Sequence, residues 1–274
     1  MTAEPTATST PSSPSPSPSV SPSPSAEVAL ASEPCPGTDR NPGAPPGRQL
    51  AGSSTNWSGY VSAVKETGVT CVEGSWIEPD VVCPSTGHQA VAVWIGIDGF
   101  SAKVLGIPST NVLVQIGTQI DCDNGEPRHG AWKEVLPAEM REERISGVVH
   151  AGDHLSARIS YAAAEFTIAI FDADTNLDYT ITQAAPGAPR KSAEWIVEAP
   201  AVNCPSSCSP VAMPKFTTVR FTGAYVTIAG QRAAIDDASW SNVKLKMVRN
   251  NIIRDTTSSL IDDGSSFSVS WRHR

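Results

Sequence analysis

An amide side chain interrupts the apolar stretch NVLVQIGTQ at residues 111–119. Its other residues are mostly β-branched or aliphatic, which is typical of a β-strand. Successive strand residues point to opposite faces, so Val114 and Ile116 share one face and Gln115 takes the other. Gln115 therefore either faces water or has a chemical task.

Two glutamates, Glu194 and Glu198, lie in the stretch AEWIVEAP. A glycosidase uses two carboxyl groups roughly 5 to 9.5 Å apart, whereas four residues along a strand separate two backbones by roughly 13 Å, so this pair is disfavoured. One glutamate facing one glutamine has a different chemistry. The carboxylate, with an ordinary pKa near ~4.3, takes a proton from water and returns it to a leaving group. The amide stabilises the developing oxyanion, and such a pair hydrolyses an amide bond.

Other catalytic arrangements are missing from the sequence. There is no G-x-S-x-G serine elbow and no Asp-Thr-Gly or Asp-Ser-Gly loop. His150 and His154, in HAGDH, would lie roughly 13 Å apart on a strand, too far for one metal ion, and the sequence predicts them to be surface histidines. We expect neither a metal nor an organic cofactor.

Short strand-like runs recur between Gly, Pro, Asn and Asp turns, and long helical periodicity is absent. The runs are VAVWIGID, NVLVQIG, AWKEVL, HLSARISY, EFTIAIFD, AEWIVEAP, TVRFTGAYVTI, VKLKMV and SFSVSW. They predict an all-β fold, an antiparallel two-sheet β-sandwich. Alternation places Trp94, Gln115 and Glu198 off the core faces, beside strand glycines. A substrate groove lined by these three is the functional interpretation, and an ordinary solvated sheet face is the alternative.

Composition divides the chain in two. Residues 1–50 include the tract TSTPSSPSPSPSVSPSPS, which cannot bury apolar surface and predicts a disordered linker or propeptide remnant. The alternating pattern of NWSGYVSAV begins soon afterwards, so we expect one folded domain over residues 51–274.

The formal net charge of -8 disfavours a nucleic-acid partner, which would require a basic face. No run is long and apolar enough to span a bilayer, and the amino terminus lacks the charged and apolar regions of a signal peptide. We expect a monomer without nucleic-acid or membrane partners, whose export signal, if it has one, is absent from this sequence.

The chain has six cysteines, without the second C-x-x-C or the His pair of a zinc site. An even number indicates disulfides and hence a secreted protein. Short loop lengths favour two pairs and leave a third, although the sequence cannot fix the pairing. The expected pairs are Cys71 with Cys83, Cys204 with Cys208, and Cys35 with Cys122.

Five motifs, in order along the chain, resemble the glutamic peptidase (eqolisin) family. They are TNWSGY, AVWIGIDG, LVQIGTQ, AWKEVLP and SAEWIVEAP, which cover most of residues 55–200, and no motif aligns after about residue 205. The resemblance implies a sandwich of concanavalin-like or jelly-roll type and an endopeptidase that works in acid with a Gln/Glu dyad. By motif, Gln115 is its oxyanion stabiliser, and Glu198 is its general base and then general acid.

The resemblance also implies substrate-binding positions near the dyad. These are Asn56 and Trp57 of NWSG, Trp94 and Asp98 of VWIGIDG, and Glu134 of AWKEVLP. Two acidic positions of the family are occupied by Gly130 and Gln119 here, so we expect a different hydrogen-bond network around the dyad.

The main hypothesis is thus a secreted acid endopeptidase that acts on polypeptides. The alternative is a non-catalytic, lectin-like sandwich that binds glycans through exposed tryptophans, because this architecture hosts both tasks. Digestion of casein at low pH separates the two hypotheses.

Overall fold

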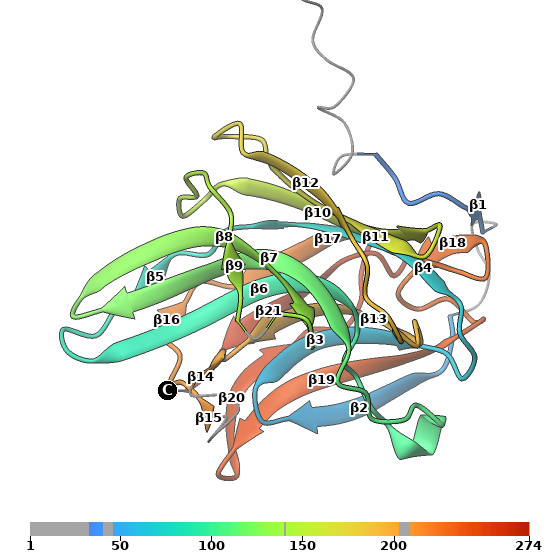
Figure 1. The fold of residues 1–274 in the computed structure, drawn as a ribbon. Helices are drawn as coiled ribbons and strands as arrows, with labels where there is room; N and C mark the ends of the chain where they lie inside the picture. Colours follow the sequence, from blue (N-terminus) through green and yellow to red (C-terminus); the bar gives the residue numbers. More distant parts are fainter. Residues whose placement is uncertain (1–32, 41–45, 140, 203–208, 274) are drawn as a thin grey trace, which may run out of the picture.

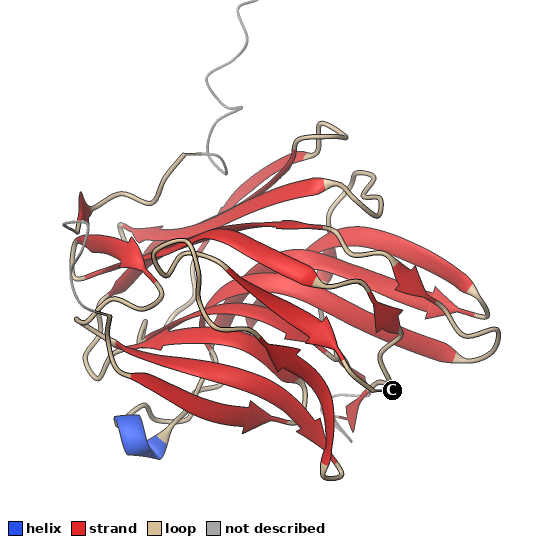
Figure 2. Cartoon of the chain, turned by 180° about the vertical axis from the view of Figure 1, so that it is seen from behind, coloured by secondary structure: helices blue, strands red, loops and turns tan. Residues whose placement is uncertain are grey.

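The protein is described by a computed structural model that covers residues 33–40, 46–139, 141–202 and 209–273. These residues form two stacked, mainly antiparallel sheets, visible in Figure 1 and from behind in Figure 2. The only helix in the described ranges is the single 3-10 turn η1 (Lys103–Leu105), and it is too short to cross a membrane. The predicted all-β, two-sheet fold is confirmed.

The first sheet contains, in spatial order, β9 (Glu143–Arg144), β8 (Glu126–Leu136), β7 (Leu113–Asp123), β6 (His88–Asp98), β13 (Ser192–Glu198), β3 (Trp57–Ala63), β19 (Ser241–Arg249) and β2 (Gln49–Ser54). Neighbours are antiparallel except for β19 and β2.

The second sheet contains, in spatial order, β12 (Asp178–Gln183), β11 (Glu165–Asp172), β10 (His154–Ala162), β4 (Val69–Ile77), β17 (Val219–Ile228), β18 (Gln231–Ala234) and β1 (Thr38–Asp39). The sheets are joined at one side by β20 (Ile252–Thr257) and β21 (Phe267–Trp271), since β20 pairs with β19 and β21 pairs with both β20 and β17. Two short pairs complete the fold, β5 (Val81–Val82) with β16 (Lys215–Phe216) and β14 (Ala201–Val202) with β15 (Ser209–Pro210).

The main core lies between the sheets and follows the predicted alternation. Val93 and Ile95 of β6, Ile116 of β7 and Trp195 of β13 are buried there against the second sheet. The opposite face of the first sheet carries a smaller apolar cluster around Trp94. Because the core anchors one face of each strand, every alternate residue of β6, β7, β8 and β13 is fixed on this other face.

Strand register brings residues from distant parts of the sequence into rows on this face, which we call the outer face. One row is Glu194, Gly96, Gln115 and Glu134. A parallel row, four residues along each strand, is Trp57, Glu198, Ala92, Gln119 and Gly130.

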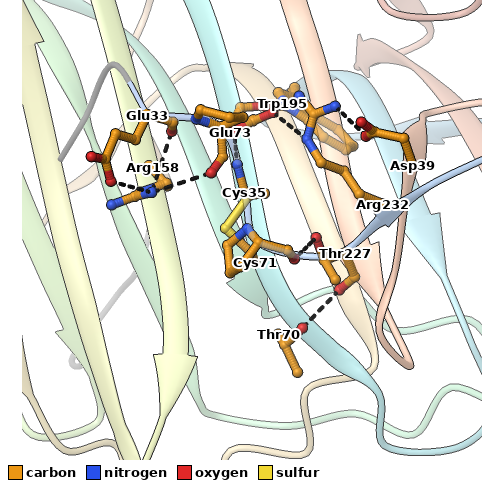
Figure 3. The surroundings of a disulfide bond; sticks show 12 residues. Glu33, Cys35, Asp39, Thr70, Cys71, Glu73, Arg158, Trp195, Thr227 and Arg232 are labelled. Atoms are coloured by element: carbon orange, nitrogen blue, oxygen red, sulfur yellow. Dashed lines mark hydrogen bonds and ion pairs between the residues drawn. A yellow bond between two sulfur atoms is a disulfide. The ribbon is translucent and has the colours of Figure 1, made fainter. Parts of the chain in front are cut away.

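The fold begins before the predicted boundary at residue 51. β1 pairs with β18, and Cys35 forms a disulfide with Cys71 of β4 (Figure 3). Beside that disulfide, Glu73 accepts hydrogen bonds from the backbone N–H of Cys35 and from the guanidinium of Arg232. The segment 33–40 is therefore part of the sandwich.

The second disulfide joins Cys83 to Cys122, so the expected pairs Cys71 with Cys83 and Cys35 with Cys122 are wrong. The short sequence separation of Cys71 and Cys83 suggested a pair that the fold does not form. Cys71 lies in β4, an extended strand of the second sheet, and the chain after β4 brings Cys83 to Cys122 of β7 in the first sheet. Cys204 and Cys208 lie outside the described residues.

We predict that a chain starting at residue 33 is as stable as the full chain, whereas one starting at residue 46 is less stable by about 2–4 kcal/mol, the typical contribution of a disulfide. The longer deletion removes Cys35 and β1 and takes the Cys35 N–H from the buried Glu73 carboxylate. Urea unfolding of the three proteins measures the difference. Equal unfolding midpoints for the two truncated chains would contradict this role of the segment.

Candidate active site

The carboxylate of Glu198 lies at the end of β13 and is held at both oxygens by neutral donors. Nδ2 of Asn56 donates to its Oε1 at 2.8 Å, and Nε1 of Trp94 donates to its Oε2 at 2.8 Å. Asn56 directly precedes β3, Trp94 lies in β6 and Glu198 ends β13, and these three strands are neighbours in the sheet. The partly buried carboxylate is thus fixed in direction without a cation bonded to it.

Trp94 and Trp57 form an edge-to-face pair beside this carboxylate, with ring centroids 5.0 Å apart. Trp94 is fully buried, whereas Trp57 is partly exposed. Gly96 makes room for the Trp94 ring, since a Cβ on Gly96 would stand 2.8 Å from Cζ3 of Trp94. Gly117 lets the backbone of β6 approach, since a Cβ there would stand 2.1 Å from the carbonyl oxygen of Val93 and 2.5 Å from Cβ of Trp94. These strand glycines therefore serve a close approach, as glycine within a strand often does.

Gln115 of β7 and Glu134 of β8 are directly opposite each other and are joined by a hydrogen bond. Nε2 of Gln115 donates to Oε2 of Glu134 at 2.7 Å. The Oε1 atom of Gln115 is buried and has no protein hydrogen-bond partner. The amide therefore keeps one N–H and its oxygen for other partners.

Burial raises the pKa of Glu198 to about 7, and the neighbouring charge of Glu134 adds to the rise. The N–H groups of Trp57, Trp94 and Asn56 partly offset this rise in the pKa. Trp57 acts through the electric field of its indole N–H, because its Nε1 has no hydrogen bond of good geometry. Burial likewise raises the pKa of Glu134 to about 7, against the hydrogen bond from Gln115. The ordinary value assumed from the sequence is wrong for Glu198, because a desolvated carboxyl group disfavours its charged form.

A third carboxyl group, that of Glu194, lies on the outer face in the row of Gln115. It is fully buried, and neither of its oxygens has a hydrogen-bond partner of good geometry. Burial raises its pKa well above the ordinary value, Ser192 offsets this weakly, and the charge of Asp98 adds to the rise. Burial of Glu194 therefore favours its protonated form.

The structure places the predicted site residues, apart from Asp98, in two groups on the outer face. Asn56, Trp57 and Trp94 surround Glu198, and Glu134 holds Gln115 on the same face. Asp98 is placed elsewhere. Its buried carboxylate accepts hydrogen bonds from the backbone N–H groups of Arg190 and Lys191. Asp98 therefore holds the segment that leads into β13, and this position does not fit the expected contact with substrate.

Sequence reasoning missed a polar network farther along the same face. Asp121 there accepts hydrogen bonds from Gln119 and Arg144. In the sequence, the departures from the family pattern at Gln119 and Gly130 are the only signal of a changed hydrogen-bond network. The position of Arg144 depends on the pairing of β9 with β8, which the sequence does not show.

A buried glutamate carboxyl and a glutamine amide on one face of a β-sandwich are the components of a glutamic peptidase. The sequence profile of the Peptidase A4 family matches residues 55–271, and the chain belongs to this family, whose members are glutamic endopeptidases. The match extends past residue 205, where no motif had been aligned. No curated protein matches the chain in a sequence comparison.

Two solved structures share the fold. A crystal structure of scytalido-glutamic peptidase with a transition state analog inhibitor is 21% identical, with a TM-score of 0.65, over 81% of this chain and 100% of that one. The aspergilloglutamic peptidase from Aspergillus niger is 22% identical, with a TM-score of 0.55, over 67% of this chain and 99% of that one. Nothing in these comparisons favours the lectin-like alternative.

We predict that the free energy of unfolding falls as the pH rises from about 4.5 to 7. The pKa values of Glu134, Glu194 and Glu198 are higher in the folded than in the unfolded chain, so folding favours their protonated forms. Their penalty is absent below the unfolded pKa and grows by at most about 1.4 kcal/mol per pH unit for each group. Carboxyl groups with a lowered pKa, such as Asp237, act in the opposite sense but at lower pH.

Urea unfolding at several pH values measures this slope. Glu194→Gln should flatten it and stabilise the protein at pH 7, because the amide has no charge to desolvate. Glu165→Gln, at an exposed position on the second sheet, is the matched control and should leave the slope unchanged. The same slope in the wild type and in Glu194→Gln would show that Glu194 does not contribute.

Proposed function

We propose that this endopeptidase hydrolyses peptide bonds with Glu198 as general base and then general acid and with Gln115 as the oxyanion donor. The observation that carries the proposal is the fixed, desolvated carboxylate of Glu198, held only by neutral N–H groups. Desolvation makes it a stronger base than an ordinary glutamate, and its two hydrogen bonds fix its orientation.

In the first step, the ionised Glu198 takes a proton from a water molecule while the water oxygen bonds to the carbonyl carbon of the substrate. The C=O π electrons move to the carbonyl oxygen, which becomes an oxyanion. In the second step, the oxyanion collapses, the C–N bond breaks, and the protonated Glu198 gives its proton to the leaving nitrogen. The carboxylate is thereby regenerated, and no cofactor is consumed.

Gln115 acts on the oxyanion because its amide is oriented beforehand. The hydrogen bond to Glu134 fixes the amide plane, and the second N–H of Nε2 is left to donate to the oxyanion. The unpartnered Oε1 is left to accept from the attacking water. The amide itself does not titrate.

Asn56 and Trp94 act as positioning residues in this scheme, because each donates one hydrogen bond to Glu198. Trp94 is fully buried, so it acts on the substrate through Glu198 rather than by contact. Trp57 is partly exposed and packs against Trp94 beside the Glu198 carboxylate, and we propose that it forms an aromatic wall for the substrate chain.

We propose that the enzyme acts outside the cell. The two disulfides of the described residues are stable in an oxidising compartment, and the protein acts there as a monomer on polypeptides.

We predict that Glu198→Gln lowers turnover of a protein substrate to near background while the protein stays folded, because the amide keeps the size but cannot accept a proton. Gln115→Ala should cost on the order of 10²–10³ in turnover, the loss seen for other oxyanion donors. Gln231→Ala, which removes an amide from the second sheet, is the matched control. Wild-type turnover by folded Glu198→Gln protein would rule out the mechanism, and wild-type turnover by Gln115→Ala would rule out its oxyanion role.

We also predict that kcat/KM falls on the acid side as Glu198 takes up a proton, and that Glu134→Gln moves this acid limb to lower pH. The charge of Glu134 raises the pKa of Glu198, so its removal keeps Glu198 ionised in stronger acid. Because the two groups are coupled, the limb in the wild type belongs to the pair. A pH–rate profile measures the shift, and an acid limb that stays in place or moves to higher pH would contradict the coupling.

A further inference from the structure

A cavity of about 300 Å³ opens on the outer face, next to the row of residues that contains Glu198. Its floor includes Ala90 of β6 and Gln119 and Asp121 of β7. Ala92 lies between Glu198 and Gln119 in one row, and Ala90 pairs with Asp121 in the next row on this face, so the cavity begins beside the row of Glu198. Its volume is at the small end for ligand pockets and suits a single long side chain.

The walls of this cavity are apolar on one side and polar on the other. Pro200, Ala201 and Val211 form the apolar side, two or more residues beyond Glu198 along the chain. Glu142 and Arg144 lie on the polar side. Such a lining fits a side chain with a long apolar stem and a polar end.

The charge of Arg144 is already matched within the cavity. Its Nη2 donates to Oδ2 of Asp121 at 2.6 Å, and Asp121 accepts a further hydrogen bond from Nε2 of Gln119 at 2.9 Å. His88 lies 3.4 Å from the other carboxylate oxygen. Asp121 and Arg144 thus neutralise each other and form a fixed polar floor.

Glu142 is the carboxylate that this floor leaves without a close partner. Its nearest cation is Arg144, at 3.8 Å, and 41% of its side chain is exposed. A pair this long and this exposed contributes little, so the charge of Glu142 is available to an incoming group.

Gly130 lies close to the guanidinium of Arg144. A Cβ on Gly130 would stand 3.3 Å from Nη1 of Arg144, a tight contact that would shift the guanidinium slightly. Glycine at this position therefore leaves space for the guanidinium above β8, and this chain has glycine where the family resemblance implies an acidic residue.

We propose that this cavity is a substrate subsite that selects a basic side chain, Lys or Arg, with Glu142 as its specificity-determining residue. The stem of the basic side chain packs on Pro200 and Val211, its charge pairs with Glu142, and the oxygen of Gln119 accepts a hydrogen bond from it. The inference rests on the proposed function, since the subsite is defined by its place beside Glu198.

The test uses a peptide series in which one lysine is moved through the three positions on either side of a single cleavable bond. Matched peptides carry norleucine or glutamate in its place. We expect one position at which the lysine peptide has a kcat/KM at least about fivefold higher than the norleucine peptide, an effect of the size of one favourable ion pair. Glu142→Gln should bring that ratio close to one, Glu142→Lys should invert it in favour of glutamate, and Glu165→Gln should leave it unchanged.

Equal rates for lysine and norleucine at every position would overturn the proposal, as would a preference for glutamate that depends on Arg144. If the wild type cleaves no peptide, the proposed function fails, and the subsite is judged separately. The Glu198→Gln protein is then titrated with the same lysine and norleucine peptides. Tighter binding of the lysine peptide that is lost on adding Glu142→Gln supports the subsite, and equal Kd values reject it.

Discussion

The site depends on keeping the carboxyl group of Glu198 poorly solvated and yet fixed. Water stabilises a carboxylate more strongly than neutral N–H groups do, so burial beside two indole rings raises the pKa to about 7. A salt bridge would have stabilised the charged form and weakened the base. The donors from Asn56 and Trp94 orient the group while leaving it basic, and the position of each donor follows from this requirement.

Strand pairing provides this arrangement because a sheet repeats its geometry in two directions. Asn56, Trp94 and Glu198 are far apart in sequence, but β3, β13 and β6 are neighbours, and their register places the three groups around one point. Gly96 then leaves the space that the Trp94 ring requires, and Gly117 lets the backbone of β6 approach β7 closely. Each glycine weakens its own strand, and the apolar core on the other face of the sheet compensates for this loss.

The strands and their faces could be predicted from the sequence because alternation is a local property. Val93 and Trp94 were assigned to opposite faces correctly, and so were Gln115 and Ile116. The dyad itself came from the ordered motifs, since a pattern of period two cannot tell an active face from a solvated one. The disulfides could not be predicted, because Cys71 and Cys83 are close in sequence but bond to distant partners, Cys71 of β4 to Cys35 and Cys83, just after β5, to Cys122 of β7. Asp98 was misassigned for a related reason: the backbone N–H groups that it accepts, at residues 190 and 191, are more than ninety residues away.

The buried acids connect stability with chemistry. Burial favours the protonated forms of Glu134, Glu194 and Glu198, so these groups destabilise the fold least in acid, whereas the proposed first chemical step requires Glu198 to be ionised. Glu134 and Glu198 are electrostatically coupled, so ionisation of one group favours the protonated form of the other, and the pair meets both demands when one group is ionised and the other is neutral. Glu194 is isolated from donors of good geometry and has no part in this coupling. The fold is most stable in acid, whereas Glu198 is ionised at higher pH. The two pH ranges therefore meet where the pair of Glu134 and Glu198 carries one proton. Charges near Glu134, including that of Glu142, raise the pKa of Glu134 and help to set this pH.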